Sequence, residues 1–224
     1  EYASVCVTQN DEVLSLKVNE QQQNHASFIQ PAIKTMFKEL HGISLAAIDA
    51  VAVTAGPGSY TGLRVGLASA KGLCFALNKP LILINTLEVM ALAAIEYCHD
   101  HSLSIQPSAA FCAMIDARRM EVFTAMYSVQ LGCILQPAAV VLNLDSFKEQ
   151  MDTQQVFFSG SGAKKFSRLI HHENACFIDA QHHAGHLAKL AAKAYGQKLF
   201  ADLAYSEPLY LKEFFTPAKT KTTF

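Results

Sequence analysis

The glycine-rich turn within residues 52–72 is the stretch of this sequence best suited to chemistry, because a buried-looking strand leads through it directly into a helix of small residues. Gly56, Gly58 and Gly62 remove Cβ atoms at three points, so backbone N–H groups could approach an anion at the positive end of that helix. The same glycines would equally suit a tight strand-to-helix connection, and both interpretations stay open. The candidate phosphate loop comprises Gly56, Gly58, Ser59, Gly62, Gly160 and Gly162.

The turn fits neither of two common nucleotide-binding motifs. No Lys-Ser or Lys-Thr pair follows its last glycine, and its G-x-G-x-x-x-G spacing is one residue longer than that of a dinucleotide site. Any nucleotide site built on this turn would therefore belong to another class.

Other candidate sites are weaker. His182 and His186 would lie one helical turn apart, a spacing that can bind metal, but no Glu follows the first His and no third ligand is evident. Asp116 with Arg118 and Arg119 could position a phosphate, although a charged turn between two strands explains them equally well. No Ser-His-Asp or Cys-His set can be assembled from spacing, so we predict no catalytic residue and no metal ligand in this chain.

The composition favours a protein that hides part of its surface against a partner. Only 17% of the 224 residues are charged, against about 25% in ordinary domains, while 51% are hydrophobic. The net charge of −1 argues against this chain binding nucleic acid by itself. Six scattered cysteines without a C-x-x-C pair, and apolar stretches well short of the ~18 residues that span a bilayer, predict a cytoplasmic protein without membrane contact.

The hydrophobic pattern predicts two consecutive α/β units of similar size. The first has strands over 2–8, 13–18, 47–55 and 80–84 and helices over 26–40, 61–77 and 86–98. The second has strands over 109–115, 121–128, 133–141, 155–159 and 176–178 and helices over 145–151, 163–170 and 182–195. We therefore expect a duplicated fold with halves at 1–103 and 104–204 and an extended tail over 205–224 that can dock back. Because the chain opens inside a strand, we also expect residues ahead of Glu1.

The helix over 61–77 should be contacted on two sides. Its polar residues Arg64, Lys71 and Asn78 recur every seven positions and form one narrow stripe, whereas a helix on a sheet needs an apolar arc of little more than about 100°. We predict an intermolecular contact in which the helix over 26–40 is the neighbour; tight packing inside the monomer is the alternative. The predicted interface comprises Phe28, Ile29, Ile33, Met36, Phe37, Gly62, Val65, Gly66, Ser69, Ala70 and Leu73.

Three motifs in order resemble the bacterial TsaB (YeaZ) family. The first, over 54–66, reads TAGPGSYTGLRVG and is followed by AKGL at 70–73 and by Pro80. The second, DARRMEV, spans 116–122, and the third, SGSGA, spans 159–163. This resemblance implies an actin-like (ASKHA), duplicated RNase-H-type fold and a role in making N6-threonylcarbamoyladenosine (t6A) at position 37 of tRNA.

The resemblance also implies that the chemistry belongs to a paralogue, TsaD, which carries a metal-binding His-x-x-x-His motif. Thr86 and Met90 stand at the corresponding positions here, and neither is a good ligand for a hard or borderline divalent ion. The family implies a non-catalytic subunit that binds and activates TsaD, joins the ATPase TsaE, pairs with itself in isolation and reaches tRNA through the complex. ATP and metal would then belong to the partner subunits, and we predict no cofactor for this chain.

The rival interpretation is an enzyme, an actin-like phosphotransferase that holds a nucleotide between its halves. Such an enzyme needs an acidic residue on a first strand, which would lie ahead of Glu1. A peptidase, a third class, is disfavoured because neither a metal pair nor a nucleophile set is present. Whether the chain binds nucleotide, contacts tRNA directly or forms a homodimer in the cell stays open at this stage.

Overall fold

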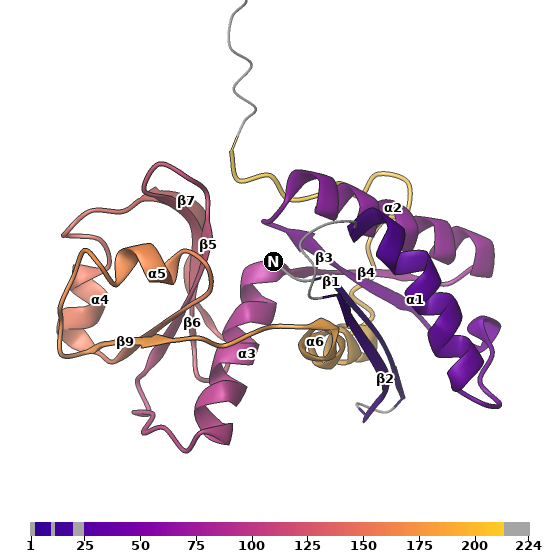
Figure 1. Ribbon diagram of the computed structural model, residues 1–224, viewed down its shortest axis with the longest axis horizontal. Coiled ribbons are helices and arrows are strands. Elements are labelled where there is room, and N and C mark those ends of the chain that lie inside the picture. The colour runs from indigo at the N-terminus through magenta and orange to yellow at the C-terminus, as the bar shows by residue number, and fades with distance from the viewer. Residues whose placement is uncertain (1–2, 10–11, 20–24, 213–224) are drawn as a thin grey trace, which may run out of the picture.

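The computed structural model describes residues 3–9, 12–19 and 25–212. The chain forms two α/β halves side by side, with helix α3 (Thr86–Asp100) between them (Figure 1). A mixed α/β fold, as the periodicity predicts, is therefore present.

The first half holds two separate pairs of strands. Strands β1 (Ala3–Gln9) and β2 (Glu12–Asn19) are antiparallel, whereas β3 (Val51–Gly56) and β4 (Leu81–Asn85) are parallel. Helix α2 (Tyr60–Leu77) packs on β3, and its neighbour is α1. Helix α1 covers His25–Glu39, and a short 3-10 turn covers Leu45–Ala47.

The second half is built on one five-stranded sheet in the order β7-β6-β5-β8-β9. The central strand β5 (Ala110–Asp116) is antiparallel to β6 and parallel to β8. The outer strands follow the same directions, since β7 is antiparallel to β6 and β9 is parallel to β8. The remaining elements are β6 (Glu121–Ser128), β7 (Cys133–Val141), α4 (Lys148–Thr153), β8 (Val156–Ser159), α5 (Ala163–Phe166), β9 (Ala175–Ile178) and α6 (Ala184–Gly196).

Two helices cross between the halves. Helix α3 packs against β5, β6 and β8, and α6 packs against β1 and β4 (Figure 1). One core cluster joins α3 residues such as Leu87 and Ala94 to Phe111 of β5, and another joins Ile82 of β4 to Leu190 of α6. Each half is thus completed by a helix from the other side.

Several predicted boundaries are wrong at their ends. The strand predicted over 47–55 starts only at Val51, because 45–47 forms the 3-10 turn. The helix predicted over 163–170 ends at Phe166, and the one predicted over 145–151 starts three residues later. The last helix starts at Ala184 because His183 caps it: its Nδ1 accepts from the Gly185 amide at 3.1 Å.

The C-terminal segment 201–212 returns along α2. Lys71 Nζ donates to the carbonyls of Ala204 and Ser206, each at 3.1 Å. Further on, the Leu209 amide donates to the Ala55 carbonyl at 2.7 Å. Residues 213–224 of the predicted tail lie outside the described residues.

Candidate functional site

A cavity of about 1260 Å³ lies in the first half, between the edges of β1 and β3, and extends towards the second half. Helices α1, α2 and α6 contribute to its lining, as do the loops at 57–59 and 160–161. Its charged lining side chains include Asp49, Lys164 and Asp179. We call this cavity the slot. Most of the predicted site residues line it.

The first glycine turn is shaped by the C-terminal segment. Gly56 has φ +114°, and a Cβ built there would lie 2.8 Å from the Leu209 carbonyl oxygen. A side chain at this position would therefore collide with the chain's own backbone. Ser59 caps α2, because its hydroxyl accepts from the Gly62 amide at 3.4 Å.

The second pair of glycines packs against β5. Gly160 has φ +93°, and its Cβ would lie 2.4 Å from the Met114 carbonyl oxygen. At Gly162 the Cβ would lie 2.7 Å from Val122 Cγ1. Close packing within the chain therefore accounts for both glycines without a bound anion.

The fold nevertheless brings the two glycine loops to one cavity. Gly58, Ser59 and Gly62 line the slot from α2's N-terminal end, and Gly160 lines it from the second half, whereas the backbones of Gly56 and Gly162 do not. Among the described residues that line the slot, the one Lys or Arg residue is Lys164. A nucleotide site between the halves therefore remains a prediction.

The predicted interface face of α1 and α2 points largely into the slot. Every residue of that set except Phe28 lines it. Met36 and Ala70 are only 1% and 5% exposed, so they support this face from below instead of offering contact atoms. Gly66 would place a Cβ 3.5 Å from Val53 Cγ2, so it lies over β3. Part of α2 faces outward: Phe75 is 82% exposed, and a Cβ on Gly72, seven residues after Val65, would meet nothing within 4 Å.

The polar stripe of α2 binds the returning segment. Arg64 Nε donates to the Tyr210 hydroxyl at 3.0 Å, and its guanidinium lies 3.9 Å from the centre of the Tyr60 ring. Together with Lys71, this residue holds the C-terminal segment to the helix. The sequence did not predict that Arg64 and Lys71 bind the C-terminal segment. The one pattern in the sequence that pointed to this role is their spacing of seven residues on the helix.

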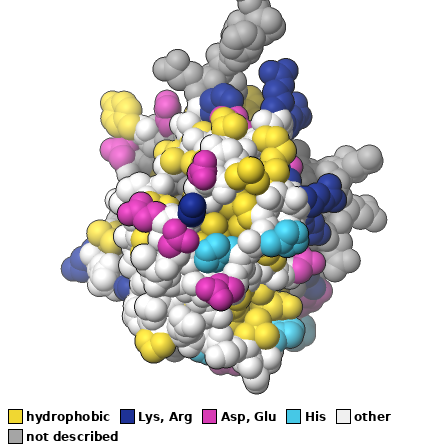
Figure 2. All heavy atoms as spheres, turned by 90° about the vertical axis from the view of Figure 1, so that its left-hand side faces the viewer, with side chains coloured by type: hydrophobic (Ala, Val, Ile, Leu, Met, Phe, Trp, Pro, Cys, Tyr) yellow, Lys and Arg dark blue, Asp and Glu magenta, His cyan; other side chains and the backbone are white. Residues whose placement is uncertain are grey.

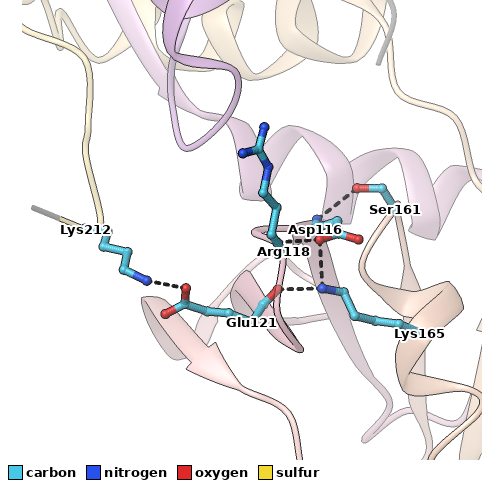
Figure 3. A network of polar contacts seen from close by, with 6 residues as sticks. All are labelled: Asp116, Arg118, Glu121, Ser161, Lys165 and Lys212. Atoms are coloured by element: carbon cyan, nitrogen blue, oxygen red, sulfur yellow. Dashed lines mark hydrogen bonds and ion pairs between the residues drawn. The ribbon is translucent and has the colours of Figure 1, made fainter. Parts of the chain in front are cut away.

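The charged turn after β5 is held by an internal network (Figure 3). The Asp116 carboxylate accepts hydrogen bonds from Lys165 Nζ at 2.7 Å and from the Arg118 amide at 2.6 Å. The Lys165 ammonium holds the pKa of Asp116 below its ordinary value. Lys165 also donates to the Glu121 carbonyl, and Lys212 pairs with the Glu121 carboxylate at 2.5 Å. The Arg118 side chain points away from this network (Figure 3).

The histidine cluster caps α6. His183 and His186 form a reciprocal capping box, and burial lowers the pKa of both imidazoles. Burial lowers the pKa of His182 further, to about 4. Within the described ranges, no three His, Cys, Asp or Glu side chains are grouped so as to hold a metal ion.

Thr86 and Met90 lie in the core at the start of α3. Both are buried, and both line the slot. The Thr86 hydroxyl is buried without a hydrogen-bond partner.

Among the helices of the described residues, none is long and apolar enough to span a bilayer.

Charges of both signs are scattered over the outer face of the second half. Figure 2 shows acidic and basic side chains interspersed with apolar ones on this face.

Comparisons with known proteins agree on one family. The family model described as TsaD, tRNA N6-adenosine threonylcarbamoyltransferase, matches residues 12–221. A tRNA threonylcarbamoyladenosine biosynthesis protein TsaB from Haemophilus influenzae is 29% identical over 200 residues, which are 85% of this chain and 81% of that protein. A tRNA N6-adenosine threonylcarbamoyltransferase from Erythrobacter litoralis is 47% identical over 70 residues, but these are only 31% of this chain and 20% of the enzyme.

A solved structure shares the whole fold. YeaZ from Pseudomonas aeruginosa superposes with a TM-score of 0.74 at 27% identity, covering 94% of this chain and 95% of that one. The match to the Erythrobacter enzyme is local, whereas a tRNA N6-adenosine threonylcarbamoyltransferase from Rickettsia canadensis is 29% identical over 190 residues, 76% of this chain and 55% of that enzyme. The TsaB and YeaZ matches cover more of both proteins compared.

Proposed function

Since the chain belongs to the TsaD family and resembles its TsaB (YeaZ) members over most of its length, we propose that it is a TsaB-type subunit of t6A synthesis. In this role it binds TsaD in the cytoplasm, activates it without catalysing a reaction itself, and joins an assembly with TsaE. The observation that carries the proposal is the extent of the TsaB match, which includes both halves.

The residues at the start of α3 support a non-catalytic role. Where the paralogue is expected to hold metal through two histidines, this chain has Thr86 and Met90, both buried in the core. A hydroxyl and a thioether are poor ligands for hard or borderline divalent ions. Transfer of the threonylcarbamoyl group would then take place on TsaD.

The order of strands supports the actin-like, duplicated fold that we propose with this function. Both halves contain antiparallel and parallel strand pairs, β1-β2 and β3-β4 in the first and β7-β6-β5 and β5-β8-β9 in the second. Helix α3 packs against β5 of the second half, and α6 packs against β1 and β4 of the first.

One observation favours the rival phosphotransferase, because loops from both halves meet at the slot. Packing against Leu209, Met114 and Val122, however, already accounts for Gly56, Gly160 and Gly162. Because contacts within the chain explain these glycines without a bound phosphate, we favour the accessory subunit.

A reconstitution separates the two functions. Purified TsaD and TsaE are incubated with ATP, an unmodified tRNA and threonylcarbamoyl-adenylate, the activated donor made from threonine, bicarbonate and ATP, with and without this chain. The t6A formed is measured by mass spectrometry of the nucleosides. We expect t6A only when this chain and TsaD are both present. Phosphoryl transfer by this chain alone, or full t6A formation without it, would contradict the proposal.

A further inference from the structure

The C-terminal segment 201–212 has little regular structure of its own. It follows α6 and contains one isolated bridge, in which the Ala201 amide donates to the Leu81 carbonyl of β4 at 2.8 Å, and one turn over 203–205. A terminal segment of this kind is ordered where other parts of the chain hold it. Its contacts therefore indicate what it does in the fold.

The first half anchors this segment at successive points. Lys71 of α2 meets it first, through the two carbonyls described above. The Leu209 amide then donates to the Ala55 carbonyl at 2.7 Å, near the end of β3. The Tyr210 hydroxyl accepts from Arg64 Nε of α2 at 3.0 Å. The segment is thus fixed to one helix and one strand of the first half.

The far end of the segment reaches the second half (Figure 3). Lys212 Nζ pairs with the Glu121 carboxylate, the first residue of β6, at 2.5 Å. The Glu121 side chain is 15% exposed, against 57% for that of Lys212. The Glu121 carbonyl also accepts from Lys165 Nζ at 2.8 Å, so this acceptor residue is held within the second half.

Two covalent connections also join the halves, and they enter the second half elsewhere. One, over 101–109, leads from α3 to the start of β5 at Ala110, and the other, over 179–183, leads from the end of β9 to α6. Glu121 lies apart from both, because β6 begins beside the other end of β5, and because β5 and β8 separate β6 from β9. Two points define an axis about which two bodies can turn, whereas a third point off that axis opposes the rotation.

The boundary between the halves allows such a movement. Helices α3 and α6 pack against each other there, and packed helices can slide by small amounts during domain movements. Both halves line the slot, with Ser59 from the first and Ser161 from the second. A change in the orientation of the halves would therefore change the shape of the slot.

We propose that the segment 201–212 is a strap that holds the two halves in one relative orientation, with Lys212 and Glu121 as its latch. The contacts with α2 and β3 fix the strap to the first half, and the latch fixes it to the second. Because the Lys212 side chain is largely exposed, salt screens the latch and weakens it. Release of the latch lets the halves turn about the two covalent connections. The proposal does not rest on the t6A function.

Distances between the halves test the strap. Nitroxide labels are placed at the exposed positions Lys34 of α1 and Lys148 of α4, through ketone-bearing residues that do not react with cysteines. Pulsed electron paramagnetic resonance then gives the distribution of distances, with excess unlabelled chain present so that each distance lies within one molecule. We expect Glu121→Gln to widen this distribution at least about 1.5-fold, and salt at about 1 M to widen that of the original chain. A distribution that neither change widens would overturn the proposal.

The matched control breaks an ion pair inside one half. Lys17→Gln removes the pair that Lys17 forms with Glu39 at 2.6 Å within the first half. We expect this variant to keep the narrow distribution, because the pair does not cross the boundary. Widening equal to that of Glu121→Gln would overturn the proposal.

Two shortened chains separate the strap from the residues that follow it. A chain ending at Lys212 keeps the strap and should keep the narrow distribution. A chain ending at Glu207 loses the contacts of Leu209, Tyr210 and Lys212, so it should widen the distribution at least as much as Glu121→Gln. A narrow distribution in the chain ending at Glu207 would show that helix packing alone sets the orientation and would overturn the proposal.

Discussion

At the scale of single residues, the glycines of this chain are explained by what a Cβ would touch. Gly56 and Gly160 combine positive φ with close backbone oxygens, and Gly162 faces the Met114 and Val122 side chains. Their motif resembles a phosphate cradle in sequence, but a glycine leaves the same pattern whether a ligand or the chain's own backbone comes close. The pattern alone could not separate these two causes.

We expect Gly160→Ala to lower the free energy of unfolding by more than about 2 kcal/mol, since it adds a clash with the Met114 carbonyl oxygen to an unfavourable φ. Gly72→Ala is the matched control, because its Cβ meets no atom within 4 Å and Ala favours a helix by up to about 1 kcal/mol. Urea denaturation measures both. Equal stability of the two variants would show that packing does not require Gly160.

The histidines at α6 make stability depend on pH. The pKa of His182 is lowered to about 4, against about 6.5 in an unfolded chain, and those of His183 and His186 are lowered as well. The unfolded chain therefore binds more protons, so stability is fully present above about pH 6.5 and falls as the pH decreases towards 4.

Thermal unfolding between pH 4 and 8 measures this dependence, and we expect His182→Gln to flatten it. His171→Gln, at an exposed position, is the control and should leave the slope unchanged. If the His182 variant kept the full slope, other groups would be responsible for the acid sensitivity.

At the scale of elements, α2 has two surfaces with different tasks. Its face towards α1 and the slot carries the predicted interface, and its polar stripe holds the segment 201–212 through Arg64 and Lys71. The sequence predicted that this helix is contacted on two sides. Which partner lies on each side depended on where the C-terminal segment returns, and no local pattern encodes that path.

We expect Val65→Arg to weaken binding of TsaD at least about tenfold, or 1.4 kcal/mol, because a charge would enter the predicted contact face. Phe75→Arg on the same helix is the control, since this residue is 82% exposed and outside the predicted set. Calorimetric titration gives both affinities, and circular dichroism checks that each variant is folded. A loss confined to Phe75→Arg would move the interface to the exposed side of α2 around Phe75.

At the scale of the whole molecule, the two halves are linked by exchanged helices. Leu190 and Ala194 of α6 pack with Ile82 and Ile84 of β4, while α3 contributes to the core beneath β5. Neither half retains its complete core when the chain is divided at the predicted boundary after residue 103. The halves should therefore depend on each other for stability.

We expect fragments 1–103 and 104–224 to lack stable structure when produced separately and to gain it when mixed, because the apolar surfaces of α3 and α6 would otherwise be exposed. Amide NMR spectra of each fragment and of the mixture report this directly. Well-dispersed spectra from the separate fragments would show that each half folds alone.

The sequence by itself determined most strands and helices of this protein, and it also determined the family to which the protein belongs. Alternating and helical periodicity act over a few residues, and the strands at 121–128 and 133–141 were predicted to the residue. Tertiary structure decided how distant segments combine: which sheet α6 covers, how 201–212 docks on α2, and that β1 and β3 stand apart with a slot between them. These features depend on contacts between residues more than 100 positions apart, such as Arg64 with Tyr210, which no local spacing records.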